Sequence, residues 1–185
     1  MRPFRPLLAL VAAFALALPA YASFHLMKVV EVFTGTPAAP NAQYVVIQMY
    51  AANQGLVQGH KITVFNASGA LAGTFTFGAT PTNPQDAQEK IFIATPDAVT
   101  FFNLPADLTM TPAMLAAGGK ACFDAIPDDC VAWGAWTGST TGVGTPVAPG
   151  GIPVGRAVIR RLDIAGSPSL LESADEAMYR VKHSG

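Results

Sequence analysis

Three aspartates crowd a short stretch of the chain, and their type and spacing suggest metal chemistry. Asp124, Asp128 and Asp129 lie close together in the segment CFDAIPDDC. Carboxylate oxygens are ligands that Ca²⁺ prefers, so these three side chains are candidate calcium ligands, and calcium is the one cofactor that the sequence suggests. The segment lacks the D-x-[DN]-x-[DN]-G run of an EF-hand. Three carboxylates are also fewer than the roughly six to eight oxygen ligands that Ca²⁺ usually takes. The alternative, which this shortfall favours, is a solvated acidic turn.

The two cysteines of the chain, Cys122 and Cys130, flank the same acidic stretch. Two cysteines permit only one intramolecular pairing, and an oxidising compartment favours it, so we expect a disulfide. A zinc site would need further Cys or His nearby, and a catalytic redox pair usually has CxxC spacing; the sequence has neither. Closing so short a loop predicts a stabilisation of about 2.5 kcal/mol.

Two tryptophans and a cluster of arginines are the candidate binding residues. Trp133 is expected to pack in the core beside the cystine, as Trp often does in β-sandwiches. Trp136 lies nearer a Gly- and Thr-rich loop and is a candidate stacking residue for a sugar or peptide, but the large area that Trp buries favours core packing for both rings. Arg156, Arg160 and Arg161 form a candidate anion or glycan site, or else the charged edge of a strand that blocks aggregation.

The sequence singles out no catalytic residue. His25, His60 and His183 are the only histidines, and no two of them are close in sequence. The HExxH, G-x-S-x-G, GxGxxG and P-loop patterns are all missing. A Ser-His-Asp triad could assemble from distant residues, but nothing in the sequence points to a particular one.

The N-terminal segment, residues 1–22, has the three parts of a secretory signal. Arg2 and Arg5 supply a basic start, residues 7–18 form an apolar run, and Ala20-Tyr21-Ala22 offers small residues for cleavage before Ser23. An uncleaved N-terminal anchor is the alternative, which the shortness of the apolar run disfavours. We therefore expect a secreted or periplasmic protein with no membrane span after signal cleavage.

The charge of the remaining chain excludes some partners. The net charge of the whole sequence is −1, and without the signal there are 9 basic against 12 acidic side chains. A weakly acidic protein lacks the electrostatic footprint of a nucleic-acid binder, so we expect no nucleic acid as a partner. It is also a poor match for an anionic membrane surface.

Short β-prone runs alternate with Gly, Pro, Asn and Ser, which predicts an all-β domain. The run at residues 44–50 (YVVIQMY) is almost continuously apolar and predicts a central strand. The turn NASG at residues 66–69 predicts a hairpin between its two flanking runs. The expected strands are residues 26–33, 44–50, 61–65, 71–77, 91–95, 120–123, 130–133 and 155–162.

The rest of the chain is expected to be loop, with two short helical pieces. Residues 112–117 could form one helical turn with Pro112 near its start. Residues 137–155 have no periodicity and predict a long loop of the kind that is often functional. Ser173 and Glu176 form a capping box in the tail, residues 166–185, which predicts a short helix there. The folded domain is expected to cover residues 23–165.

The order of segments resembles that of exported bacterial proteins with a lamin-tail-like domain. FHLMKVVEVF, QYVVIQMY, IFIATP, GGKACFDAIPDDCVAWG and GRAVIRRLDIAGSPSLLESAD carry the resemblance, which covers about residues 23–175, and the cysteine-containing segment is its most specific part. The resemblance implies an immunoglobulin-like β-sandwich used for binding or adhesion, with no catalytic residue to carry over. One departure is Val46, where an acidic residue is common in the family.

We therefore expect an all-β, immunoglobulin-like (lamin-tail-like) β-sandwich that follows an N-terminal signal peptide. Its expected function is that of a non-catalytic binding or adhesion module of the cell envelope or extracellular space. The partner would be an unknown protein or glycan at the cell surface, met by residues 137–155, Trp136 and the aspartate loop. The alternatives are an accessory subunit of a secreted hydrolase, a Ca²⁺-assisted hydrolase that uses the aspartates, and a purely structural envelope protein.

Overall fold

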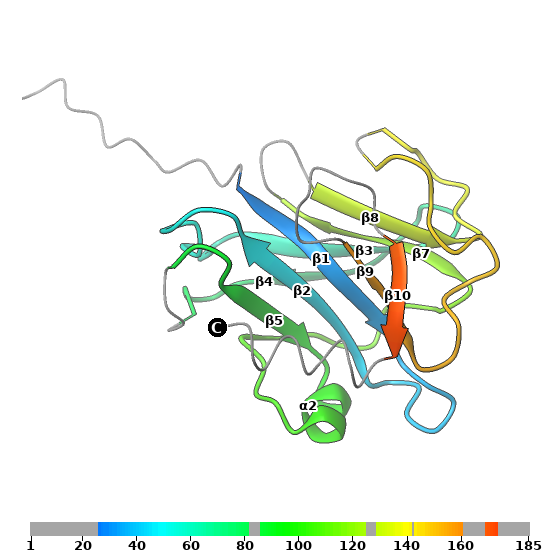
Figure 1. Ribbon diagram of the computed structural model, residues 1–185, viewed down its shortest axis with the longest axis horizontal. Helices are drawn as coiled ribbons and strands as arrows, with labels where there is room; N and C mark the ends of the chain where they lie inside the picture. Colours follow the sequence, from blue (N-terminus) through cyan, green and yellow to red (C-terminus); the bar gives the residue numbers. More distant parts are fainter. Residues whose placement is uncertain (1–25, 82–85, 125–128, 142, 161–168, 174–185) are drawn as a thin grey trace, which may run out of the picture.

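The computed structural model describes residues 26–81, 86–124, 129–141, 143–160 and 169–173, and these residues form two β-sheets with one short helix (Figure 1). The six-stranded sheet has the order β10-β9-β1-β2-β5-β6, and the four-stranded sheet has the order β4-β3-β7-β8. The elements are β1 (Met27–Thr34), β2 (Gln43–Met49), β3 (Lys61–Asn66), β4 (Leu71–Thr76), β5 (Lys90–Ala94), α2 (Pro96–Phe102), β6 (Leu108–Thr109), β7 (Gly118–Phe123), β8 (Asp129–Gly134), β9 (Arg156–Ile159) and β10 (Ser169–Ser173). The predicted all-β sandwich is confirmed.

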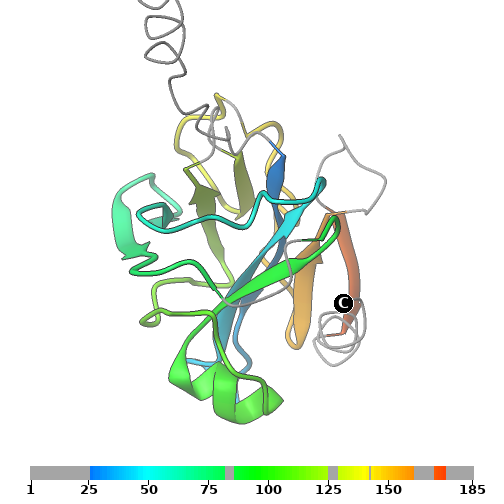
Figure 2. The same cartoon turned by 90° about the vertical axis from the view of Figure 1, so that its left-hand side faces the viewer.

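The main core lies between the two sheets. Alternate residues of a strand point to opposite faces, so each strand contributes every second side chain to this core. Val32 of β1 and Ile47 of β2 meet Ile62 of β3, Val131 of β8 and the fully buried Trp133. Figure 2 shows the four-stranded sheet, in teal and olive, to the left of β1, β9 and β10. The expected core position of Trp133 is confirmed.

A second apolar cluster covers the other face of the six-stranded sheet. Phe33 and Tyr44 point away from the main core, and the helix α2 adds Ala98 and Phe102 to them. The rings of Phe33 and Tyr44 stack with their centroids 5.2 Å apart, and Phe102 meets both rings edge-on. Because both faces of the sheet are covered here, all seven residues of β2 are buried, which confirms the predicted central strand.

The helix is not where the sequence analysis placed it. Thr95 accepts a hydrogen bond from the backbone N–H of Ala98, Pro96 occupies the first turn, and Asn103 ends the helix in the left-handed conformation. These are the signals of a capped helix over Pro96–Phe102. The expected helical turn at residues 112–117 is wrong, because the backbone N–H groups of Ala113 and Met114 donate to the side chain of Gln43 instead.

The predicted hairpin is confirmed as β3 and β4. Lys61 pairs with Thr76 and Val64 with Gly73, and one β-bulge follows, in which Ala72 of β4 is the extra residue opposite the step from Val64 to Phe65. Its turn works as the sequence indicated, since the Asn66 side chain accepts hydrogen bonds from two backbone N–H groups within the turn and Gly69 has a φ of 89°.

Strand β9 lies inside the six-stranded sheet, between β1 and β10, so the expectation that the arginines mark a sheet edge is wrong. Strand β10 pairs with β9 beyond the domain boundary expected at residue 165. The predicted signal (residues 1–22), Asp128, Arg161 and residues 174–185 of the tail lie outside the described residues. Within the described part of the chain, no helix has the length and apolar character needed to cross a membrane.

Tyr44 carries a polar group into the second apolar cluster. Its hydroxyl donates to Glu31 at 2.5 Å, and both side chains are buried. Burial of the phenol, and then the negative charge of Glu31, raise the pKa of Tyr44 well above 10. Tyr44 therefore keeps its proton in the folded protein at a pH where it ionises in the unfolded chain.

This raised pKa predicts a loss of stability in alkali. Because the folded state holds the Tyr44 proton more tightly than the unfolded state, the free energy of unfolding falls as the pH rises above about 10. A titration of the native protein followed at 295 nm should show one phenol that ionises only on unfolding, and that signal should be missing in Tyr44→Phe. Ionisation of every phenol near pH 10 while the protein stays folded would contradict the prediction.

Candidate functional site

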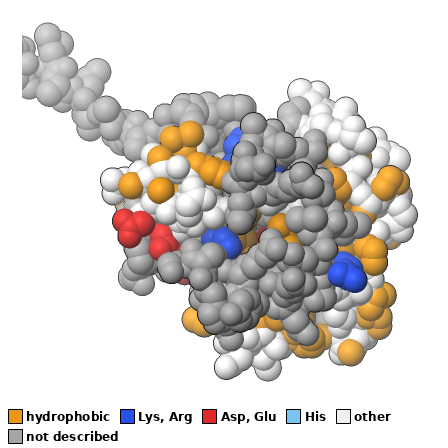
Figure 3. Space-filling model, in the orientation of Figure 1, with side chains coloured by type: hydrophobic (Ala, Val, Ile, Leu, Met, Phe, Trp, Pro, Cys, Tyr) orange, Lys and Arg blue, Asp and Glu red, His pale blue; other side chains and the backbone are white. Residues whose placement is uncertain are grey.

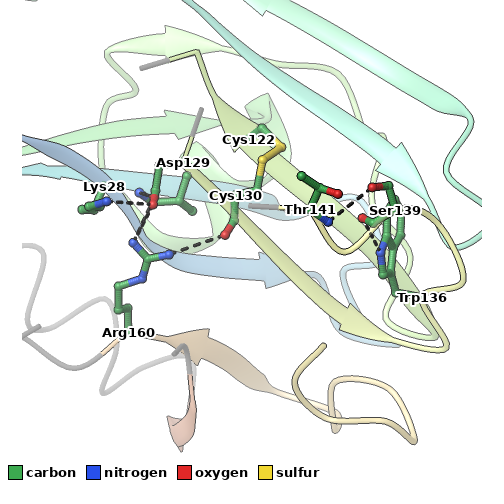
Figure 4. The surroundings of a disulfide bond; sticks show 9 residues. Lys28, Cys122, Asp129, Cys130, Trp136, Ser139, Thr141 and Arg160 are labelled. Atoms are coloured by element: carbon green, nitrogen blue, oxygen red, sulfur yellow. Dashed lines mark hydrogen bonds and ion pairs between the residues drawn. A yellow bond between two sulfur atoms is a disulfide. The ribbon is translucent and has the colours of Figure 1, made fainter. Parts of the chain in front are cut away.

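The disulfide joins β7 and β8 across the hairpin that holds the aspartates. Cys122 and Cys130 are directly paired residues of the two strands, with a Cα–Cα distance of 4.1 Å and an S–S distance of 2.01 Å, so the predicted disulfide is confirmed. Ala121 and Val131, the next directly paired residues away from the loop, point into the main core. Asp124 follows β7 and Asp129 begins β8, so the two described aspartates flank the loop that closes this hairpin. Figure 4 shows Asp129 beside the disulfide.

Asp129 is the centre of an ion-pair cluster. Arg160 Nη1 donates to both carboxylate oxygens of Asp129, at 2.9 and 3.0 Å, and Lys28 Nζ lies 3.3 Å from Oδ1 (Figure 4). The backbone N–H of Val29 donates to Oδ2 at 2.6 Å. The side chains of Asp129 and Arg160 are almost entirely buried. The carboxylate therefore neutralises the guanidinium charge, whose burial without a partner would cost much free energy.

A bulge in β1 makes room for this cluster. The pairing of β1 with β2 shifts between Val29 and Glu31, which leaves Val30 as an extra residue. The bulge frees the N–H of Val29 to bind Asp129, while the carbonyl of Val30 accepts a hydrogen bond from the backbone N–H of Arg160. The cluster therefore ties β8 of one sheet to β1 of the other.

This geometry changes the role of two predicted site residues. Arg160 is 6% exposed, so it is not available as a surface anion or glycan site. Arg156, at the start of β9, is exposed, and the structure does not bring the two arginines to one site. Asp129 is likewise not a solvated turn residue, because its two oxygens already accept four contacts from cationic and backbone groups.

Asp124 has a separate set of partners. Its Oδ1 lies 3.1 Å from His60 Nδ1 and accepts a hydrogen bond from the backbone N–H of Lys61 at 2.9 Å. Asp124 and Asp129 therefore form hydrogen bonds and ion pairs with different sets of residues. Among the residues that the structure describes, no three His, Cys, Asp or Glu side chains come together as metal ligands.

Trp136 is buried rather than displayed as a stacking residue. It is 8% exposed, and its indole N–H donates to the carbonyl of Ser139 at 3.3 Å (Figure 4). Lys120 Nζ lies 4.5 Å from the centroid of the Phe65 ring and 5.0 Å from that of Trp136, so the cation sits against both rings. Gly138 lies so close to the indole that an added Cβ would come within 2.3 Å of it. These contacts favour the core-packing interpretation of Trp136.

An open apolar cleft lies at the end of the sandwich where β1 turns into β2. Its volume is about 640 Å³, within the usual range for ligand sites. None of the described residues that line it is charged, and two of them, Leu115 and Val154, are 66% and 73% exposed. Figure 3 shows hydrophobic side chains gathered along the right-hand and lower margin of the molecule. The lining residues are Thr34, Gly35, Thr36, Pro37, Pro40, Asn41, Gln43, Ala72, Pro112, Ala113, Met114, Leu115, Ala116, Ile152 and Val154.

Gln43 holds one wall of this cleft in place. Its side-chain oxygen accepts from the backbone N–H groups of Ala113 and Met114, both at 2.9 Å, and its amide nitrogen donates to the carbonyl of Met114 at 2.8 Å. The backbone N–H of Ile152 then donates to the carbonyl of Ala116. Residues 112–116 are therefore fixed between β2 and the segment before β9.

The β1–β2 turn forms the facing wall. Thr36 and Ala39 exchange two backbone hydrogen bonds, each 3.1 Å long, and the Thr36 hydroxyl accepts a third from Ala39. Gly35 has a φ of 91° and passes so close to Pro40 that a Cβ would come within 2.5 Å of its carbonyl oxygen. Both walls are thus held by internal hydrogen bonds, which makes the cleft pre-formed.

Comparisons with protein-family models, with curated proteins and with solved structures find no match to this chain. The cleft was not predictable from the sequence. Its lining comes from four separated stretches, and short-range patterns indicate none of their contacts. The only local signal was a proline near each exposed aliphatic residue, Pro112 three residues before Leu115 and Pro153 directly before Val154.

The ion-pair cluster predicts a large effect of one isosteric change. Asp129→Asn keeps the shape of the side chain but leaves Arg160 buried without its counter-charge, which should lower the free energy of unfolding by about 3 kcal/mol. Asp124→Asn is the matched control at a more exposed position, and we expect it to cost less than about 1 kcal/mol. Urea denaturation measures both, and equal effects would refute a special role for Asp129.

The packing of Trp136 predicts a structural phenotype. Trp136→Ala removes a buried ring and the aromatic contact of Lys120, so the free energy of unfolding should fall by about 3 kcal/mol. Thermal or urea unfolding of the oxidised protein provides the measurement. An unchanged thermal midpoint would instead show that the ring contributes no packing energy and would restore its candidacy as a stacking residue.

Proposed function

We propose that this protein is an exported, non-catalytic binding or adhesion module, and that the apolar cleft is its binding site. The observation that carries the proposal is a pre-formed, uncharged cleft with large aliphatic side chains exposed on its rim. A partner that covers exposed aliphatic groups beside a cleft is stabilised in the complex by about 25 cal/mol per Å² of apolar surface removed from water.

The compartment is inferred from two features. The Cys122–Cys130 disulfide is of a kind that forms and persists in oxidising compartments. The signal expected in residues 1–22 would direct the chain across the cytoplasmic membrane. Together they support a place in the periplasm or outside the cell. The resemblance to lamin-tail-like domains agrees with a binding role and with an immunoglobulin-like connection of the strands.

The cleft rather than the aspartate loop is the proposed site. Asp129 and Arg160 neutralise one another inside the fold, and Asp124 holds His60 and the start of β3. Each of these polar groups has a structural task. Leu115 and Val154, by contrast, leave most of their surface in water although both line the cleft. A partner bound in the cleft would remove this apolar surface from water.

A neutral fluorescent probe tests this proposal. N-phenyl-1-naphthylamine should bind the oxidised protein with an increase in fluorescence. Leu115→Ser and Val154→Ser should each weaken binding by about fivefold, because each removes about 1 kcal/mol of apolar contact. Neither change should lower the thermal midpoint, since both side chains are exposed.

The matched control is Leu56→Ser. Leu56 is exposed to a degree comparable with Leu115, but it does not line the cleft, so its replacement should leave probe binding unchanged. Equal affinities of all three variants and the parent protein, or no binding at all, would refute the cleft as the binding site.

A further inference from the structure

Among the described residues, strand β4 is an edge strand without the usual protection. It ends the four-stranded sheet and pairs only with β3 among the described residues. Its sequence, LAGTFT, contains no charge and no proline. Proteins normally protect such an edge with charged side chains, proline or a covering segment, because an open edge accepts a further strand.

The unpaired backbone groups of β4 can be located from its register. Phe77 donates its backbone N–H to the carbonyl of His60, which marks these two residues as a hydrogen-bonded pair. Hydrogen-bonded and non-hydrogen-bonded pairs alternate along an antiparallel ladder. The N–H and C=O groups of Thr74 and Thr76 therefore point away from β3, toward the open edge.

The opposite edge of the same sheet is covered by the chain itself. Val147 lies parallel to β8, where its N–H donates to the carbonyl of Ala132 and its carbonyl accepts from Gly134. The side chain of Val147 packs against the main core at the same time. One extended residue thus supplies both backbone pairing and an apolar side chain at that edge, and β4 has no such cover within the described residues.

The cleft adjoins β4 at its first residues. The bulge sets Ala72 as the extra residue of β4, and Ala72 lines the cleft. Bulges end regular pairing and redirect a side chain. A strand added along Thr74 and Thr76 would therefore leave the ladder near Ala72 and continue into the cleft. Leu71, next to it, is 62% exposed and extends the apolar rim.

We propose that the partner is an extended, uncharged polypeptide segment that adds to β4 as a strand and places an aliphatic side chain in the cleft. This inference rests on the proposed function and names the class of partner for the same site. The absence of charge on both the described lining and β4 selects an uncharged segment, because an ionised side chain would lose its hydration there without gaining a counter-charge.

The test uses peptides displayed on phage and selected on the purified, oxidised protein. We expect the enriched peptides to be uncharged and to carry aliphatic residues at alternate positions. A synthetic copy of one such peptide is then N-methylated at each position in turn. Only every second N-methyl group should reduce affinity, since a strand uses alternate N–H groups for pairing with its neighbour.

Thr74→Pro is the matching change in the protein. It removes an N–H that points to the open edge, where proline is tolerated, and should reduce peptide affinity at least tenfold. Thr74→Val, which keeps the N–H, should change affinity less than twofold. Both variants should bind N-phenyl-1-naphthylamine as the parent does, which also reports on correct folding of the cleft.

Other outcomes would overturn the inference. Peptides that bind Thr74→Pro as well as the parent, or that show no period of two in the N-methyl series, would exclude strand addition. A dimer in sedimentation analysis that Thr74→Pro dissociates would make a second copy of this chain the occupant. Probe binding without any enriched peptide would leave the proposed function standing and refute only the polypeptide partner, whereas loss of both would refute the two together.

Discussion

The buried carboxylate of Asp129 joins the two sheets at one end of the sandwich. It accepts from Arg160, beyond the end of β9, and from the backbone of Val29 in the bulge of β1, while its own backbone belongs to β8. A carboxylate and a guanidinium buried together are costly to separate, so the pair constrains how β8 lies over β1. The Cys122–Cys130 disulfide holds β7 and β8 together beside it. The charges of Asp129 and Arg160 at this end therefore stabilise the fold by pairing with each other.

The opposite end of the sandwich is held by neutral hydrogen bonds. Gln43 satisfies the backbone of residues 113–114, and the turn between β1 and β2 satisfies its own. An amide side chain is suited to this task because it donates and accepts at once. The cleft consequently keeps its shape without charged groups, and its aliphatic rim remains exposed. The two ends of the sandwich therefore differ in structure: one is held by a buried ion pair, and the other presents an uncharged cleft.

Local patterns predicted most of the strands, but few of the contacts between them. The run at residues 44–50 and the turn at Asn66–Gly69 were predictable because propensity and turn chemistry act over a few residues. Helix α2 carried the local signals Thr95, Pro96 and Asn103, but Pro112 was a competing signal and led to a wrong prediction. The contact of Asp129 with Arg160 spans 31 positions and that of Gln43 with Met114 spans 71, so no local pattern could reveal them. The candidate binding role of Arg160 failed for the same reason, since its charge alone does not tell a surface arginine from a paired one.

The edges of the two sheets differ in how they are protected. The edge of β5 is met by the two-residue strand β6, and that of β8 by Val147. Short edge strands and covering segments both limit pairing with other chains. At β4 the described residues offer neither, and the strand begins beside the uncharged cleft. An open edge alone would be a liability for aggregation, and an apolar cleft alone would accept many small molecules. Because the two features meet at Ala72, an extended polypeptide can satisfy both the hydrogen-bonding edge and the apolar cleft, whereas a small molecule can fill only the cleft.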